Sequence, residues 1–217
     1  MGDATGGRPK SLVDVCGKPL LAYQIGRLST AGVGRVIVSC ADDQGEIFAE
    51  ELDGLGVEIV CAPEPERLGR GGGIKFAAAR RQESGDVIAM NGDELVDVDF
   101  AALLERHRAT DAVATVTVAR PASPFGVVEL GDDDVITGFS EGGQIPYWVN
   151  CGVYVLSQAA IDRFPDRGDH ESTVFPELAA EGRLHAYRHE GLWLTVNTPK
   201  ELRRAREHVA EHPEWLA

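Results

Sequence analysis

Apolar runs of strand length alternate with amphipathic segments of helix length along most of the 217-residue chain. Short continuous apolar runs are typical of strands buried on both faces, and apolar positions three to four residues apart are typical of helices. The pattern predicts helices over residues 20–30, 46–52 and 73–81, a helix capped by Asp99 that reaches about residue 107, and strands over residues 35–40, 57–62, 86–90 and 112–118. This alternation predicts an α/β fold with a Rossmann-like, doubly wound and mostly parallel sheet.

A different pattern begins after Pro121. Two short apolar stretches, residues 126–130 and 135–140, flank a Gly-Asp-Asp-Asp turn and predict a hairpin inserted beside the main sheet. The remaining pattern predicts strands over residues 147–156, 184–188 and 192–196, and helices after Ser157, after Ser172 or Thr173, and from Thr198-Pro199. No repeat or linker interrupts the chain, so we expect a single domain over residues 1–217 with a small accessory β region at about 121–155.

Charge and hydropathy narrow the class of protein. The formal net charge is −14, which disfavours a nucleic-acid-binding face because phosphate backbones are bound by clustered lysines and arginines. No apolar run approaches the ~20 residues that span a bilayer, and the N-terminus lacks the pattern of a signal peptide. We therefore expect a cytoplasmic protein without nucleic-acid or membrane partners, in which an anionic substrate meets a local group of cations and a metal ion.

The N-terminus carries the first candidate site. Gly6, Gly7 and Arg8 stand directly before Pro9-Lys10. Glycine lets backbone N–H groups approach an anion and neighbouring cations neutralise it, so this composition indicates a loop around phosphate. Such loops normally follow a buried strand at the carboxyl edge of a sheet, whereas no strand stands before these glycines in the printed sequence.

A carboxylate follows the predicted strand over residues 86–90. The sequence there is Ile88-Ala-Met-Asn-Gly-Asp93, and open parallel sheets bind ligands beyond the carboxyl ends of their strands. Asp93 is therefore a candidate Mg²⁺ ligand, because Mg²⁺ takes a few hard oxygens from the protein and completes its shell with phosphates and water. The alternative is that Asp93 only caps the turn.

The stretch Glu66-Arg-Leu-Gly-Arg-Gly-Gly-Gly-Ile-Lys75 lies between a predicted strand and a predicted helix. Its glycines would let the backbone pack against a base or a phosphate near a helix N-terminus. A flexible connector is the alternative. The glycine spacing differs from the G-x-G-x-x-G fingerprint, which disfavours an NAD-dependent enzyme.

Short motifs follow one another in a fixed order. They are Pro9-Lys10-Ser-Leu-Val, Gly17-Lys-Pro-Leu, Leu68-Gly-Arg-Gly-Gly, Asn91-Gly-Asp93, Phe125-Gly-Val-Val, Phe139-Ser-Glu141, Asn150-Cys-Gly-Val-Tyr154 and Asn197-Thr-Pro199. In this order they resemble the motifs of the sugar-phosphate nucleotidyltransferases, over nearly the whole chain. Each motif alone is common, whereas the ordered series is specific.

The resemblance implies a Mg²⁺-dependent transferase that joins a nucleoside triphosphate to a sugar 1-phosphate and releases pyrophosphate. Lys10 would neutralise triphosphate oxygens, and Asp93 with Asn197 would hold the metal. The sugar would contact Gly126, Glu141 and Asn150. The residues implied in nucleotide binding are Gly6, Gly7, Arg8, Leu68, Gly69, Gly71, Gly72, Asn91 and Gly92. Similarity to mannose-1-phosphate guanylyltransferases favours GTP slightly, and the resemblance admits a homo-oligomer.

Three departures from the family pattern bear on activity. The family's first strand and loop are not found before Pro9, glycines follow Glu141 where the family has a lysine, and Thr195 stands where it has an aspartate. For the strand, we expect that its neighbours close up, that another segment fills its place, or that the biological start lies upstream.

The candidate substitutes for the lysine are Lys75, Arg70 and Arg120. Because Thr195 stands in place of the aspartate, we expect metal binding to be weaker than in the family. These departures also support a second hypothesis. The protein would then bind a nucleotide sugar as a regulatory or partner subunit, without turnover.

Overall fold

The computed structural model describes residues 8–123 and 125–215, and it confirms the predicted α/β class. The helices are α1 (Leu20–Thr30), α2 (Gly45–Glu51), α3 (Gly69–Ala78), α4 (Phe100–Arg108), α5 (Gln158–Arg163), α6 (Val174–Ala180) and α7 (Pro199–Glu211). The strands are β1 (Asp14–Val15), β2 (Lys18–Pro19), β3 (Arg35–Ala41), β4 (Glu58–Glu64), β5 (Val87–Met90), β6 (Glu94–Val96), β7 (Ala114–Ala119), β8 (Val127–Leu130), β9 (Ile136–Ser140), β10 (Val149–Leu156), β11 (Leu184–Arg188) and β12 (Trp193–Thr195). Three short 3₁₀ turns are η1 (Lys10–Leu12), η2 (Asp132–Asp134) and η3 (Pro213–Trp215).

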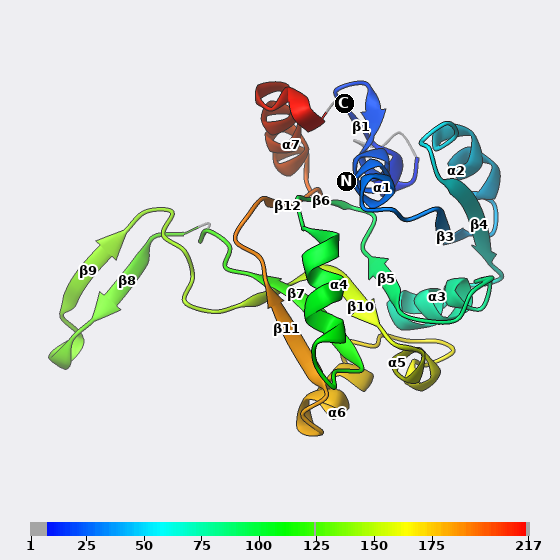
Figure 1. Cartoon of the computed structure of the whole chain (residues 1–217). Coiled ribbons are helices and arrows are strands. Elements are labelled where there is room, and N and C mark those ends of the chain that lie inside the picture. The colour runs from blue at the N-terminus through cyan, green and yellow to red at the C-terminus, as the bar shows by residue number, and fades with distance from the viewer. Residues whose placement is uncertain (1–7, 124, 216–217) are drawn as a thin grey trace.

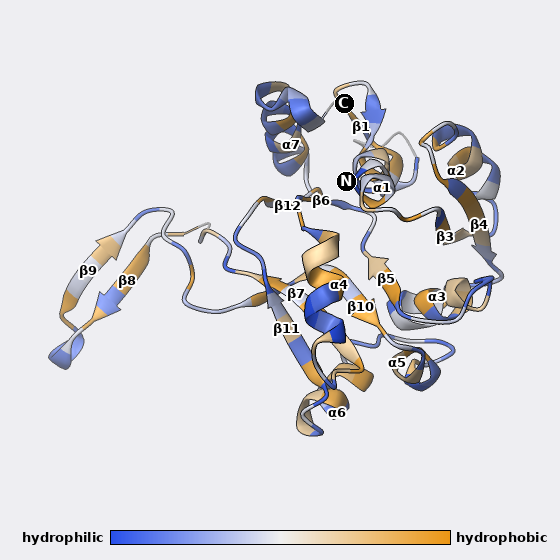
Figure 2. Cartoon of the chain, in the orientation of Figure 1, coloured by the Kyte–Doolittle hydropathy of each residue, from blue (hydrophilic) through white to orange (hydrophobic). Residues whose placement is uncertain are grey.

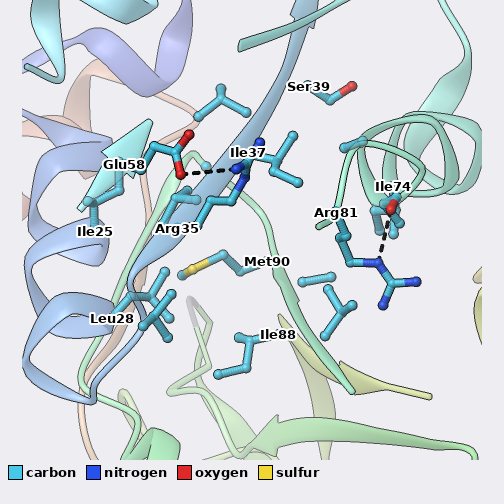
Figure 3. Close-up of a pocket in the computed structure, with 18 of the residues that line it drawn as sticks. Ile25, Leu28, Arg35, Ile37, Ser39, Glu58, Ile74, Arg81, Ile88 and Met90 are labelled. Carbon is cyan, nitrogen blue, oxygen red and sulfur yellow. Dashed lines mark hydrogen bonds and ion pairs between the residues drawn. The ribbon is translucent and has the colours of Figure 1, made fainter. Parts of the chain in front are cut away.

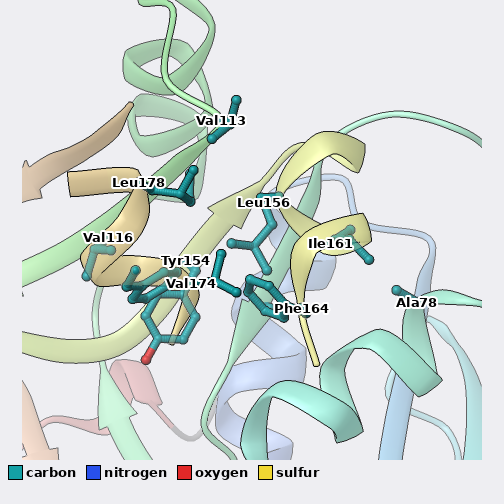
Figure 4. Packing of buried hydrophobic residues seen from close by; sticks show 13 residues of the cluster. Ala78, Val113, Val116, Tyr154, Leu156, Ile161, Phe164, Val174 and Leu178 are labelled. Atoms are coloured by element: carbon teal, nitrogen blue, oxygen red, sulfur yellow. The ribbon is translucent and has the colours of Figure 1, made fainter. Parts of the chain in front are cut away.

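A four-stranded sheet in the order β11-β7-β10-β5 is the largest sheet of the described residues (Figure 1). β11 is parallel to β7, whereas β10 runs antiparallel to both β7 and β5. The strands β5, β7 and β10 are rich in apolar residues (Figure 2). One face packs against α3, α5 and α6 around Tyr154, Leu156 and Phe164 (Figure 4), and the other face packs against α4 and the end of α1.

The parallel strands β3 and β4 form a separate pair. Among the described strands, β3 is hydrogen-bonded only to β4, and β5 only to β10. A cavity of about 940 Å³ lies between β3 and β5 (Figure 3). In the described part of the chain, β3 and β5 therefore do not close the gap expected where the family has its first strand.

The glycine-rich stretch is helical rather than a loop. α3 begins at Gly69, four residues before the predicted start at position 73, so the prediction that these glycines precede the helix was wrong. Other boundaries agree more closely, and α1 matches the prediction at both ends. The predicted caps Asp99 and Thr198 each accept a backbone hydrogen bond, and Thr198 completes a capping box with Glu201. Ser157 and Thr173 stand at the N-cap positions of α5 and α6 but make no side-chain capping hydrogen bond.

The predicted hairpin is present as β8 and β9, joined through η2. In Figure 1 it extends away from the four-stranded sheet. Its apolar side chains are exposed, including Phe125 at 76%, Leu130 at 64% and Phe139 at 68%. The hairpin therefore contributes little to the buried core.

None of the helices in the described ranges combines the length and the apolar character needed to cross a bilayer. This finding leaves the expected cytoplasmic location a prediction.

Candidate functional site

Lys10, Asp93 and Asn197 meet at the carboxyl end of β5. Lys10 lies in η1, Asp93 follows β5, and Asn197 follows β12. The pairing of β6 with β12 and a hydrogen bond from the Val196 amide to the Asp93 carbonyl, at 3.0 Å, hold the last two segments together. The ammonium of Lys10 donates to Asp93 Oδ2 at 2.8 Å and to Asn197 Oδ1 at 2.5 Å. Asp93 and Asn197 therefore both contact the Lys10 ammonium, although up to 187 positions separate the three residues in the sequence.

The donor set of this cluster fits a hard divalent cation. One carboxylate oxygen and one amide oxygen already contact the same ammonium group, so both oxygens lie close enough to face a single ion. Oxygen donors of these two kinds suit Mg²⁺. No group of three or more metal-binding side chains occurs in residues 8–123 and 125–215, so further ligands would come from substrate phosphates and water.

Asn91 connects this cluster to β10. Its backbone amide donates to the Gly152 carbonyl at 2.8 Å, and its Nδ2 donates to Glu94 Oε1 at 3.1 Å. Gly152 has a φ of +66°, and a Cβ atom there would lie 2.2 Å from Asn91 Nδ2. Glycine is therefore required at position 152 by both backbone conformation and close contact.

Glu94 was missed by the sequence analysis. Its side chain is buried beneath Asn91 and accepts a hydrogen bond from Trp193 Nε1 at 2.9 Å. Burial raises the pKa of Glu94 from 4.5 to about 7, although the hydrogen bonds from Asn91 and Trp193 act in the opposite direction. Its position directly after Asp93 was the only available signal, and the three-residue strand β6 is too short to show a pattern.

A second polar cluster surrounds Asn150. Asn150 Nδ2 donates to Tyr154 Oη at 2.8 Å and to Glu171 Oε1 at 2.9 Å, and the Tyr154 hydroxyl donates to the same carboxylate at 2.8 Å. Arg70 Nη1 lies 2.8 Å from Glu171 Oε2. Tyr154 is fully buried, and burial raises the pKa of its hydroxyl. Glu171 was missed because it lies in an irregular segment, where periodicity gives no information.

The glycines of α3 pack against the segment of residues 166–170. The Gly71 amide donates to the Gly168 carbonyl at 2.9 Å, and the Gly168 amide donates to the Leu68 carbonyl at 2.7 Å. A Cβ atom on Gly72 would lie 2.5 Å from the Asp166 carbonyl oxygen. Close approach of two backbone segments explains these glycines, including Gly69, and their predicted contact with a nucleotide stays a prediction.

The hairpin holds two of the predicted sugar contacts. A Cβ atom on Gly126 would lie 3.3 Å from Glu141 Oε2, so these two positions are neighbours. Within the described ranges, no hydrogen bond or ion pair joins Glu141 to Asn150 or Asp93, and Figure 1 shows the hairpin extended away from the four-stranded sheet. The structure thus links Asn150 to Asn91 through Gly152, and within the described residues it shows no such link for Gly126 or Glu141.

The remaining predicted nucleotide contacts lie near the N-terminus and after β5. Arg8 forms an ion pair with Glu51 of α2. Gly92 lies against η1, because a Cβ atom on it would be 3.2 Å from Ser11 Cβ. Gly6 and Gly7 lie outside the described residues.

The three candidate substitutes for the family lysine have different surroundings. Arg70 pairs with Asp169 and with Glu171 of the Asn150 cluster. Lys75 donates to the Phe164 carbonyl at 2.9 Å and pairs with Asp166, and Arg120 lies 4.7 Å from the centre of the Trp148 ring. Of these three, Arg70 is the one that pairs with a residue hydrogen-bonded to a predicted sugar contact, because Glu171 accepts from Asn150.

Comparison with known proteins identifies the family of the chain. The model of the family "Nucleotidyl transferase" matches residues 3–212. The mannose-1-phosphate guanylyltransferase catalytic subunit beta of Xenopus tropicalis is 31% identical over 226 residues, covering 96% of this chain and 62% of that protein. The mannose-1-phosphate guanylyltransferase of Mycobacterium tuberculosis is 32% identical over 206 residues, covering 90% and 57%. The chain therefore spans about three fifths of the length of these curated relatives.

Solved structures show the same fold. HddC from Yersinia pseudotuberculosis superposes with a TM-score of 0.73 at 26% identity, covering 93% of this chain and 90% of that one. Its crystal structure complexed with GMP-PN gives a TM-score of 0.72 at 25% identity, with the same coverage of both chains.

Proposed function

We propose that this chain, which belongs to the nucleotidyl transferase family, transfers a nucleotidyl group from a nucleoside triphosphate to a sugar 1-phosphate. The observation that carries the proposal is the convergence of Lys10, Asp93 and Asn197 at the carboxyl end of β5. We propose GTP as the preferred nucleotide and Mg²⁺ as the cofactor. The guanylyltransferase names of the relatives and the GMP-PN complex of HddC support the choice of nucleotide.

The chain's own residues would act by alignment and charge neutralisation. An oxygen of the sugar phosphate attacks the α-phosphorus in line, the bond from that phosphorus to the bridging oxygen breaks, and pyrophosphate leaves. Lys10 would leave its two oxygen partners and donate to the triphosphate. When Mg²⁺ is bound by Asp93 and Asn197, it neutralises further phosphate oxygens.

On the sugar side, the fixed contacts would come from the Asn150 cluster. Asn150, Tyr154 and Glu171 hold one another in place through short hydrogen bonds. A carboxylate and an amide in such a network suit hydroxyl groups, which both donate and accept. Glu141 would join this cluster only if the hairpin moved toward it.

The test is pyrophosphate release from the whole chain with Mg²⁺. Each of the four common triphosphates is paired with a set of sugar 1-phosphates that includes mannose 1-phosphate. We expect release that requires a sugar phosphate and is fastest with GTP. The D93N variant should lose roughly 100-fold or more in rate, as when a charge-stabilising group is removed, whereas D43N, at an exposed aspartate of the loop after β3, should not change it.

A second function is supported by the place of the hairpin. Because the β8–β9 hairpin, which Gly126 and Glu141 flank, extends away from the four-stranded sheet in Figure 1, the chain would bind a nucleotide sugar and regulate a partner without turnover. Saturable binding of GDP-mannose with no pyrophosphate release, under the conditions of the assay above, would favour this second function and overturn the first.

A further inference from the structure

Two arginine side chains lie beside Trp148 at the carboxyl edge of the four-stranded sheet. The guanidinium carbon of Arg120 lies 4.7 Å from the centre of the Trp148 ring, and that of Arg188 lies 5.3 Å from it. Arg120 directly follows β7, Arg188 ends β11, and Trp148 directly precedes β10. Three neighbouring strands therefore bring two positive charges to one aromatic ring, whose face attracts cations.

Within the described residues, neither of these guanidinium groups has a carboxylate partner. No Asp or Glu of residues 8–123 and 125–215 forms an ion pair with Arg120 or Arg188, and both arginines are exposed. The chain has 35 acidic residues against 21 lysines and arginines, and Arg70, Arg163 and Arg167 each pair with a carboxylate. A shortage of acidic residues therefore does not explain the unpaired state. Two positive charges beside one ring repel each other, and an anion bound to both would offset this repulsion.

The strand register places the two arginines on the same face of the sheet as Asn150. Val118 of β7 is paired with Asn150 on one side and with Arg188 on the other, and directly paired residues share a face. Arg120 lies two positions after Val118, and Trp148 lies two positions before Asn150, so side-chain alternation gives both the same face. The arginines and the proposed sugar contact therefore belong to one surface.

The order of the strands then sets the order of the functional groups along this edge (Figure 1). Asp93 follows β5, Asn150 lies on β10, and Arg120 follows β7. Neighbouring strands are about 4.8 Å apart, so β7 lies roughly 10 Å from β5. A ligand with its 1-phosphate beside Asp93 and its sugar at Asn150 therefore has its far side toward Arg120 and Arg188.

We propose that Arg120 and Arg188 bind a second anionic group, a phosphate or a carboxylate, on the sugar of the sugar 1-phosphate. The planar guanidinium group binds either anion through two parallel hydrogen bonds. Contact with the Trp148 ring restrains both arginine side chains before the ligand binds. The proposal rests on the proposed function, which makes Asn150 a sugar contact, and it narrows the substrate to a sugar 1-phosphate with two anionic groups.

The test measures the binding of three sugar phosphates to the whole chain by isothermal titration calorimetry. The ligands are glucose 1-phosphate, glucose 1,6-bisphosphate and glucuronic acid 1-phosphate. Mg²⁺ and α,β-methylene-GTP, which cannot release pyrophosphate, are present, and each titration is repeated without the nucleotide. We expect at least one of the two ligands with a second anionic group to bind about tenfold more tightly than glucose 1-phosphate, or better. Which of the two binds tightly distinguishes a phosphate from a carboxylate.

A pair of double variants locates the second anionic group. R120M/R188M removes both charges and keeps the aliphatic parts of the side chains, so it should abolish the preference and leave the binding of glucose 1-phosphate unchanged. R203M/R204M removes two exposed arginines of α7 and should keep the full preference. Circular dichroism confirms that both variants are folded before they are compared.

The proposal is overturned if the wild type binds all three ligands equally or none of them, or if R120M/R188M keeps the preference. It is also overturned if inorganic phosphate binds as tightly as glucose 1,6-bisphosphate, because the arginines then hold a free anion. Pyrophosphate release from a sugar 1-phosphate without any binding preference would overturn this proposal alone. A binding preference without pyrophosphate release from any sugar phosphate would overturn only the proposed function.

Discussion

The Lys10–Asp93–Asn197 cluster and the Asn150–Tyr154–Glu171 cluster differ in burial. The side chains of Lys10 and Asp93 are 36% and 32% exposed. Tyr154 is fully buried, and its neighbours are tied to one another and to Arg70. A half-exposed ion pair adds little to stability, whereas an unsatisfied buried polar group is costly. The first cluster can therefore exchange its partners for substrate and metal, and the second is a fixed part of the fold.

The largest effect on stability is expected from E171A. This change removes the acceptor shared by Asn150 and the buried Tyr154 hydroxyl, and it should lower the free energy of unfolding by about 3 kcal/mol. Urea unfolding measures it. E177A, which removes a surface partner of Arg163, is the matched control and should leave the midpoint unchanged. Equal midpoints for the two variants would contradict the assignment of a buried network.

A pH effect of similar size is expected from Glu94, which lies between the two clusters. Burial raises the pKa of Glu94 from 4.5 to about 7 in the folded chain. Between pH 4.5 and 7, the Glu94 carboxyl group is therefore protonated in the folded state and ionised in the unfolded state. The free energy of unfolding should therefore fall as pH rises from about 4.5 to 7 and level off above.

The variant E94Q lacks this titration. Relative to E94Q, the wild type should lose on the order of 3 kcal/mol between pH 4.5 and 8. Unfolding both proteins in urea across this range gives the difference, in which the other titrating groups cancel. A constant difference would show that the carboxyl group titrates normally.

A smaller loss is expected from G152A. The substitution puts a Cβ atom 2.2 Å from Asn91 Nδ2 at a φ of +66°, so it adds a clash to the backbone strain and should cost about 2–3 kcal/mol. G182A has a similar φ of +69° with no atom within 4 Å, and it should cost only about 1 kcal/mol. Thermal unfolding of both variants separates the cost of backbone strain from the cost of the clash with Asn91. Equal losses of stability would show that the clash contributes nothing.

The smallest effect on stability is expected from K10M. Breaking a half-exposed pair should change the free energy of unfolding by no more than about 1 kcal/mol, although pyrophosphate release should fall as in D93N. A large loss of stability together with unchanged pyrophosphate release would show that Lys10 stabilises the fold and does not take part in catalysis.

Much of this architecture follows from local sequence. The α1 boundaries, the Asp99 and Thr198 caps and the hairpin at residues 131–134 were predicted because capping, turn chemistry and periodicity act over a few residues. The start of α3 was missed because its glycines disfavour a helix locally, whereas packing against residues 166–170 stabilises one.

The site shows the same division between local and long-range information. Asp93 and Lys10 were found from motifs, and the structure brings them together. Glu171 and Glu94 depend on contacts between distant segments, which no periodic pattern records. The position of the hairpin depends on packing of the whole chain, so its distance from Asn150 was not predictable from the Gly126 and Glu141 motifs.

We infer that Asp93 and Asn197 offer their oxygens to one divalent cation beside a nucleotide. Electron paramagnetic resonance tests this through the binding of Mn²⁺, a paramagnetic substitute for Mg²⁺, to the wild type, D93N and N197D in the presence of GTP. We expect D93N to lose most of the protein-bound Mn²⁺, and N197D, which adds a carboxylate, to bind it several-fold more tightly. Equal Mn²⁺ binding by all three proteins would contradict it.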